Sequence, residues 1–279
     1  EVGSTEFIGY SENECSDAKI LAQIEGDGFV DIVLNKTPFY AECGGQVGDS
    51  GYIESGNIKA EVLTTFKVND LYVHRCKLLN GDVIIGDVVK AYNDVPRREE
   101  IRVHHTSAHL LQAALVKVLG DEVKQAGSQV EENRMRFDFT FSRAMSHDEI
   151  KKVEDLMNKW IGEGYCVNTQ VMGIKEAELT GATALFGEKY GDTVRVVSIE
   201  KDGESISKEF CAGTHARLLK DLRVVKIVSE SAIAAGTRRI EVVASASAIN
   251  YLNAKSAELD KLSAKFKAHF DDVVERVDK

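Results

Sequence analysis

Two pairs of potential metal ligands, widely separated in the chain, are the residues with the clearest capacity for chemistry. The first pair is His105 and His109, and the second is Cys211 and His215; each pair has the spacing i, i+4. On a helix this spacing puts both side chains on one face, so two imidazoles can reach the same ion. Three imidazole nitrogens and one thiolate suit zinc, a borderline-soft ion. The sequence therefore predicts one zinc ion that joins two distant parts of the fold.

Three further histidines are left out of the ligand set: His104 is interpreted as a neighbour of the site, and His74 and His147 as structural. His104 competes with His105, but it lies five positions before His109 and is rotated off the shared helix face. His74 and His147 have no candidate ligand beside them in the sequence. An HxxxH pair alone is weak evidence for metal binding, because such spacing also occurs among surface and core histidines. The CxxxH pair in a glycine-containing turn strengthens this evidence, because it completes a set of four potential ligands.

Four protein ligands fill a tetrahedral shell, which is typical of structural zinc sites, whereas catalytic sites keep one position open. Water activation at a filled shell requires a ligand to leave or the shell to expand; otherwise the ion positions and polarises the substrate. Thr106 stands where HExxH metalloproteases carry their general-base glutamate. This difference argues against peptide cleavage. A more labile bond, such as an aminoacyl ester, stays possible as the substrate.

Composition describes an ordinary soluble protein of the cytoplasm. The chain has 279 residues, 43% hydrophobic and 29% charged, which allows two domains. No apolar run approaches the roughly 20 residues that span a bilayer, and no signal peptide is recognisable, so no membrane partner is predicted. Five cysteines with irregular spacing argue against a disulfide framework. The absence of a starting Met suggests a piece of a longer protein.

The net charge of −10 argues against a general nucleic-acid coat, because non-specific binding depends on an excess of Lys and Arg. A local basic patch stays compatible with that charge. The arginines that could form one are Arg97 with Arg98, Arg134 with Arg136, and Arg238 with Arg239. The simpler interpretation is that each is solvated or paired with a nearby acid.

The pattern of the chain predicts an α+β fold in three parts. Residues 1–95 contain short strands separated by Gly, Asp and Asn turns, typical of a small β-barrel. Residues 96–246 mix helices and strands. Residues 247–279 are charged, carry a thin apolar stripe and contain no Gly or Pro. This last part predicts a long helix, as at the start of a coiled-coil or oligomerisation segment.

Within 96–246, helical spacing predicts a helix over 97–119 that ends at Gly120. A second helix is predicted over 146–161, where Ser146 and Glu149 form a capping box. Strands are predicted over 135–141, 166–174, 193–199, 222–229 and 238–244. In the barrel, residues 37–51 break the strand pattern with adjacent glycines that allow close backbone approach. That stretch is either a long barrel turn or a gate against a pocket in the second part.

Four motifs, in order, resemble the editing part of the alanyl-tRNA synthetase family. Residues 105–111 (HTSAHLL) resemble its HxxxH motif, and residues 208–215 (KEFCAGTH) its CxGTH motif, with Ala212 where Gly is frequent. Residues 37–51 are similar to its glycine-rich barrel loop, and residues 236–241 (GTRRIE) to the segment that closes the domain. The resemblance extends from about residue 7 to 248.

The resemblance implies a translation-factor-like β-barrel followed by a zinc-containing α+β editing domain and a terminal helix. It implies hydrolysis of Ser-tRNA(Ala) and Gly-tRNA(Ala), with the acceptor end of tRNA(Ala) as partner. It also implies roles for individual residues: zinc ligation by His105, His109, Cys211 and His215, catalysis by Gln125 and Cys211, and substrate binding by Thr37, Gly44, Gly45, Gln46 and Asp49. The aminoacylation motifs of class II synthetases are absent, so no activation of alanine is expected.

Three alternatives stay open at this point. A free-standing alanyl-tRNA editing protein is the nearest rival within the family. A metal-dependent lyase or hydrolase of small molecules would use the same ligands. A zinc-stabilised RNA-binding module without hydrolysis is the non-enzymatic alternative.

Overall fold

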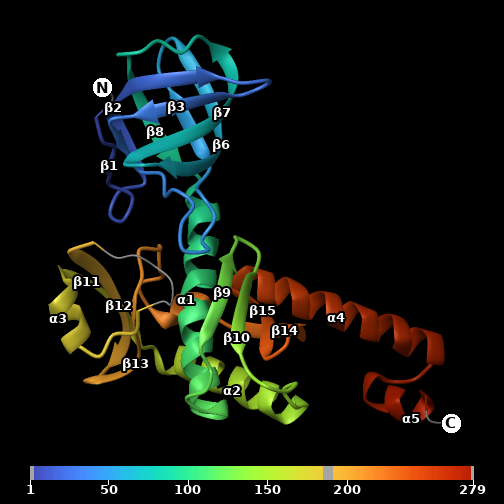
Figure 1. The fold of residues 1–279 in the computed structure, drawn as a ribbon. Coiled ribbons are helices and arrows are strands. Elements are labelled where there is room, and N and C mark those ends of the chain that lie inside the picture. Colours follow the sequence, from blue (N-terminus) through green and yellow to red (C-terminus); the bar gives the residue numbers. More distant parts are fainter. Residues whose placement is uncertain (1–2, 185–190, 278–279) are drawn as a thin grey trace.

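The computed structural model describes residues 3–184 and 191–277. A β-barrel lies at one end, and a long helix, α1 (Val95–Leu119), leads from it into a mixed region of helices and sheets (Figure 1). Among the described residues, no helix is both long and apolar enough to cross a membrane. The mixed helix-and-strand fold with an N-terminal barrel, expected from the sequence, is confirmed.

The barrel is closed by six strands in the order β2-β3-β7-β6-β5-β8, and all neighbours pair antiparallel. Its interior is filled by inward-facing apolar side chains such as Ile32, Leu34 and Ile53, each fully buried. Two short strands, β1 and β4, pair in parallel beside it. The bounds are β1 (Glu6–Phe7), β2 (Glu14–Glu25), β3 (Val30–Leu34), β4 (Lys36–Thr37), β5 (Gly51–Glu54), β6 (Ile58–Val68), β7 (Leu71–Gly81) and β8 (Val88–Asn93).

Helix α1 follows the barrel directly and forms the axis of the rest. The Asp94 side chain caps its first turn by accepting from Arg97 N, and its last turn ends at Gly120, whose φ is 105°. Every residue from Val103 to Leu111 is buried, because protein surrounds the middle of α1 on all sides. The predicted helix over 97–119 and its glycine cap are confirmed.

Two antiparallel sheets lie on either side of α1 (Figure 1). The first has the order β14-β15-β10-β9 and the second β11-β12-β13. Apolar side chains of α1, α2 and the first sheet form one continuous core with β12. The bounds are β9 (Gln125–Val130), β10 (Met135–Thr140), α2 (His147–Glu163), β11 (Cys166–Gly173), α3 (Ile174–Leu179), β12 (Thr193–Lys201), β13 (Glu204–Phe210), the 3-10 helix η1 (Leu219–Leu222), β14 (Val225–Ala234) and β15 (Thr237–Ala244).

Most predicted elements of this region are confirmed, including the capping box of Ser146 and Glu149. Three elements were not predicted: β9, α3 and β13. The strand predicted from residue 222 starts three residues later, because Leu222 closes η1 and Arg223 has a positive φ of 58°. The arginine pairs are bound to acids as the simpler interpretation predicts: Arg98 to Asp49, Arg134 to Glu131, Arg238 to Glu230 and Arg239 to Asp138.

The terminal segment is not the single helix expected over 247–279. Helix α4 (Ser245–Phe266) ends where Lys267 adopts a left-handed conformation, with φ 47° and ψ 45°. A 3-10 turn, η2 (Phe270–Asp272), and a short helix, α5 (Val273–Val277), follow, and α5 lies against α4. The buried Val273 side chain accounts for this reversal, since continuing the helix would leave it exposed. The expected oligomerisation through this segment stays a prediction.

A buried ion pair joins the barrel to α1. Arg98 in the first turn of α1 is fully buried and binds the Asp49 carboxylate, with 2.8 Å from Nε to Oδ1. The same guanidinium donates to the carbonyl oxygens of Gly9 (2.8 Å) and Pro38 (2.9 Å). Asp49 also accepts from Tyr40 N at 2.7 Å. One pair of charges thus fixes three barrel segments against the start of the helix.

We expect Asp49→Asn to lower the free energy of unfolding by about 3–5 kcal/mol, because it leaves the Arg98 charge buried without its counter-ion. Chemical denaturation with urea measures this loss. The control Asp148→Asn breaks an exposed pair with Lys152 on α2 and should cost less than about 1 kcal/mol. Equal losses for the two variants would contradict the linking role of Asp49.

A second prediction concerns His74, which is fully buried in the barrel. Its Nε2 lies 2.7 Å from Thr37 Oγ1 and its Nδ1 lies 2.9 Å from Ile32 O. Burial lowers the pKa of His74 to about 4, against an ordinary value of 6.5. The unfolded chain therefore binds a proton that the folded chain does not, and stability falls as the pH drops from 6.5 towards 4.

The contribution of His74 to this acid loss is about 3 kcal/mol at about 1.4 kcal/mol per pKa unit. We expect His74→Gln to reduce the loss of stability between pH 6.5 and 4 by that order, measured as urea unfolding at each pH. The variant His147→Gln, at the exposed start of α2, serves as control. If His74→Gln leaves the parent's pH dependence unchanged, the buried neutral imidazole is not its source.

Candidate metal centre

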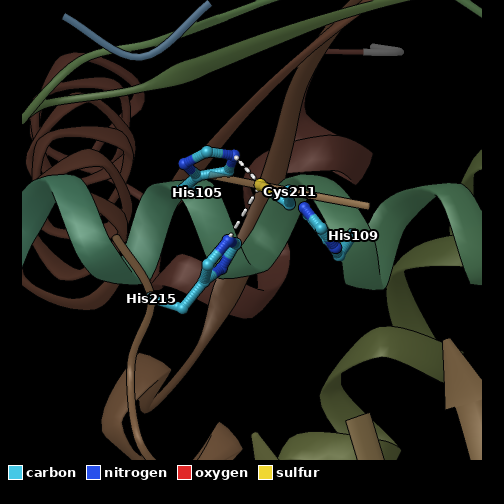
Figure 2. Close-up of side chains that lie close together, drawn as sticks. All are labelled: His105, His109, Cys211 and His215. Atoms are coloured by element: carbon cyan, nitrogen blue, oxygen red, sulfur yellow. Dashed lines mark hydrogen bonds between the residues drawn. The ribbon is translucent and has the colours of Figure 1, made fainter. Parts of the chain in front are cut away.

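The four predicted ligands converge on one point between α1 and the turn that follows β13 (Figure 2). One potential ligand atom from each of His105, His109, Cys211 and His215 lies within 4.8 Å of all the others. Cys211 Sγ is 3.4 Å from His105 Nε2 and 3.3 Å from His215 Nε2. The three histidines are buried and Cys211 is half-buried. The structure therefore brings together, in position to hold one metal ion, residues far apart in the sequence.

The dimensions of the cluster match those of a tetrahedral ion. Zinc binds thiolate at about 2.3 Å and imidazole at about 2.0–2.1 Å, which places the sulfur and a nitrogen about 3.5 Å apart on a tetrahedron. The observed separations of 3.3 and 3.4 Å are close to that value. Three nitrogens and a sulfur are also the donors that zinc prefers.

The outer nitrogen of each imidazole has a neighbour that orients the ring. His105 Nδ1 lies 2.7 Å from Gln46 Oε1, and His215 Nδ1 lies 3.2 Å from Thr106 Oγ1. His109 Nδ1 lies 3.4 Å from the Glu209 carboxylate, as an ion-pair contact without hydrogen-bond geometry. Such neighbours fix the ring and direct the inner nitrogen, Nε2, toward a metal.

The charges of the cluster favour the thiolate form of Cys211. Burial alone would raise the pKa of Cys211, but the imidazoles of His105, His215 and His109 outweigh it and hold the pKa well below its ordinary value. Burial alone would lower the pKa of His109, but the Glu209 carboxylate and Cys211 raise it to about 9. The thiolate is the form of cysteine that binds metal ions. His109, by contrast, would have to release its proton when it binds a metal.

Glycine is required at one point of the turn. A Cβ on Gly213 would lie 1.9 Å from Cε1 of His105, so only glycine allows the turn to approach α1 this closely. The neighbouring Thr214 is held by Gln46, whose amide donates to Thr214 Oγ1 and accepts from Thr214 N, both at 2.9 Å. These contacts explain in physical terms the pattern Cys-x-Gly-Thr-His.

A cavity of about 250 Å³ opens beside the cluster. His105, His109 and Cys211 form part of its wall. The other lining residues are Tyr40, Cys43, Gly44, Ala108, Gln125, Ser128, Gly191, Thr193, Val194, Arg195, Glu209, Phe210, Ala212 and Gly213. The cluster thus forms part of a space large enough for a small polar group.

The predicted site residues fall into two groups around this cavity. Gln125, Gly44 and Cys211 line it, and Gln125 Nε2 lies 3.4 Å from Ser128 Oγ. The lining does not include Thr37, Gly45, Gln46 or Asp49, so their predicted contact with substrate stays a prediction. Gln46 instead orients His105, and Asp49 anchors the barrel to α1.

Three residues on the cavity wall were not predicted as site residues: Glu209, Arg195 and Ser128. A usable signal existed for Glu209, which lies two positions before Cys211 in the sequence. Residues two apart on a strand share a face, so a strand ending at Cys211 predicts a carboxylate on the ligand side. The sequence contains no comparable signal for Arg195, whose position depends on the pairing of β12 with β13.

Comparison with known proteins agrees with these observations. A family described as "tRNA synthetases class II (A)" matches residues 2–97, and one described as "Threonyl and Alanyl tRNA synthetase second additional domain" matches residues 194–241. The second match contains Cys211, His215 and the strands around them.

Curated relatives match almost the whole chain. They include the alanine–tRNA ligase of Synechococcus sp. (strain JA-3-3Ab), 43% identical over 98% of this chain and 31% of that protein. The enzyme of Wolbachia pipientis wMel is 43% identical (99% of this chain, 32% of that protein), and the chloroplastic/mitochondrial enzyme of Populus trichocarpa is 39% identical (99% and 29%). The chain spans about a third of the length of these relatives. On its motifs, its two family matches and these relatives, the chain belongs to the alanyl-tRNA synthetase family.

Proposed function

We propose that the cavity hydrolyses the ester of mischarged tRNA(Ala), removing serine or glycine from the 3′ end. The observation that carries this proposal is the four-ligand cluster, three of whose members line a cavity that also contains Gln125, in a chain whose relatives are alanine–tRNA ligases. Water would add to the ester carbonyl, the bond to the ribose oxygen would break, and tRNA would leave with a free hydroxyl.

Zinc is the ion that we assign to the cluster, held by His105, His109, Cys211 and His215. When bound, it supplies Lewis acidity that can polarise a carbonyl or lower the pKa of water. Cys211 and the two histidines of α1 place this chemistry at the cavity wall, while Gln46, Thr106 and Glu209 orient the imidazoles. Cys211 takes part in catalysis as the ligand that faces the substrate.

Selection of serine over alanine would depend on polar groups in the cavity. An activation pocket for alanine rejects the extra hydroxyl of serine only by roughly 100-fold. A site that hydrogen-bonds this hydroxyl discriminates in the other direction, because alanine leaves its buried polar groups unpaired at a cost of roughly 1–3 kcal/mol. Gln125 is the residue to which we assign this recognition, since its amide lies in the cavity wall beside Ser128.

The glycine-rich loop would shape the cavity rather than supply chemistry. Cys43 and Gly44 line the wall, and Gly45 follows with a φ of 82°. A Cβ on Gly45 would lie 2.4 Å from Ser128 O, so the loop packs directly against β9. Asp49 and Gln46 hold its far end to α1 and to the ligand turn.

We expect the purified chain to contain one zinc ion, measured by elemental analysis. Chelation should lower the free energy of unfolding by on the order of 3 kcal/mol or more, because the ion binds the folded state alone. Cys211→Ala should lose most of the metal. Cys166→Ala replaces an exposed cysteine outside the cavity and should retain it. Full zinc content in Cys211→Ala would exclude the thiolate as a ligand.

Deacylation of Ser-, Gly- and Ala-tRNA(Ala) by the metal-loaded chain tests the activity itself. The parent should hydrolyse the first two and spare the third. Cys211→Ala should lose deacylation. In Gln125→Leu the rate of deacylation of Ser-tRNA(Ala) should fall about 10- to 100-fold, as expected when the serine hydroxyl is left unpaired. Gln129→Leu, a half-buried glutamine of the same strand outside the cavity, is the control. A metal-loaded parent without hydrolysis would favour a zinc-stabilised RNA-binding module.

A further inference from the structure

The turn that carries two of the ligands is held by its backbone as well as its side chains. Its three successive carbonyl oxygens each accept a hydrogen bond from a distant side chain. Arg195 Nη1 donates to Cys211 O at 2.9 Å and to Gly213 O at 2.8 Å. The hydroxyl of Tyr10 donates to Ala212 O at 2.5 Å. Two side chains thus engage every carbonyl between Cys211 and Gly213.

These two side chains come from different parts of the fold and contact each other. Arg195 belongs to β12, and the backbone of Cys211 donates to Arg195 O at 2.9 Å. Tyr10 lies in the barrel segment between β1 and β2. The Cζ atom of Arg195 lies over the Tyr10 ring, 4.4 Å from its centroid. The Tyr10 ring also packs edge-on against the Phe7 ring, with 4.9 Å between the two centroids. The barrel therefore reaches the ligand turn directly.

The turn needs such support because it lies beyond the end of the β-ladder. Strand β13 ends at Phe210, one residue before Cys211. The orientation of the following peptide groups determines where the Cys211 and His215 side chains point. Hydrogen bonds to the carbonyl oxygens fix those peptide planes. Gln46, in the glycine-rich loop, accepts from Thr214 N and donates to Thr214 Oγ1, so the barrel holds the turn at two points.

We propose that Tyr10 is a positioning residue, by which the barrel keeps the ligand turn in the geometry that binds the metal. This inference rests on the proposed zinc site and adds that the barrel completes the site, from outside the helix and the turn that carry its ligands. Tyr10 does not act on the substrate itself: its hydroxyl is directed to Ala212 O, and the cavity lining does not include it.

The matched variants Tyr10→Phe and Tyr72→Phe test this role in the full chain. Tyr10→Phe removes the hydroxyl and keeps the ring that packs against Phe7 and Arg195. Tyr72 belongs to the same aromatic group, stacked on Phe7 at 5.4 Å, and among the described residues its hydroxyl makes no hydrogen bond that the structure records. The rate at which zinc passes to an excess of 4-(2-pyridylazo)resorcinol should rise about tenfold in Tyr10→Phe and stay unchanged in Tyr72→Phe.

A second measurement separates positioning from general packing. In Tyr10→Phe, the melting temperature of the metal-free chain should change as little as in Tyr72→Phe, while the rise in melting temperature on adding zinc should shrink. A drop that is equal with and without zinc, or zinc release at the parent rate, would overturn the inference and leave the metal site intact. A parent chain that binds no zinc would remove the proposed metal site, and this inference with it.

Discussion

The close approach of the 211–215 turn to α1 is the contact on which the site depends. Gly213 lies against the ring of His105, and a larger residue there would push the turn away from the helix. Gln46 sits at the same junction, where one amide contacts His105 Nδ1 and both donor and acceptor groups of Thr214. Three elements far apart in the sequence therefore meet at a single buried amide. Its position requires the glycine-rich loop, which Asp49 and Arg98 tie to the first turn of α1.

Burying a polar run in the middle of α1 is costly unless each group finds a partner. His109 Nδ1 has only the ion-pair contact with Glu209, and other polar groups of the run find partners both locally and at long range. His104 Nδ1 lies 2.7 Å from Glu100 O, and its Nε2 accepts from Ala244 N at 3.1 Å. The Thr106 hydroxyl donates to Arg102 O and accepts from Ala216 N. These bonds tie α1 to β15 and to the segment after the ligand turn, so the same polar residues that flank the ligands also fix the position of the helix.

The ligands were predictable from the sequence because their signal is local. The i, i+4 spacing of His105 and His109 fixes their shared face once the helix is predicted, and the same regularity predicts the capping box at Ser146. The strand β13 was missed, since its polar sequence (ESISKEF) lacks a clear apolar alternation. No Gly or Pro in the sequence predicts the end of α4 at Lys267. Its cause is tertiary, namely the packing of α5 against α4.

Residue roles were less predictable than residue types, because a role depends on which side chain faces the cavity. Asp49 is a charged residue in a glycine-rich loop, and this pattern suits the binding of a ligand as well as an ion pair inside the protein. Only the buried position of Arg98 shows that Asp49 forms the ion pair. Gln46 and Gln125 are chemically identical, yet one is sealed behind His105 and the other lines the cavity.

The arrangement of the cluster also indicates from which side a substrate would approach. His105, His109 and Cys211 line the cavity, whereas His215 does not and instead lies against Thr106 of α1. The cavity-facing side of the cluster is therefore formed by two imidazoles and the sulfur. A group entering the cavity meets both Gln125 and Cys211 in its wall, and His215 lies outside the lining. Four protein ligands can thus hold an ion while one side of the cluster faces the cavity, because only that side is accessible.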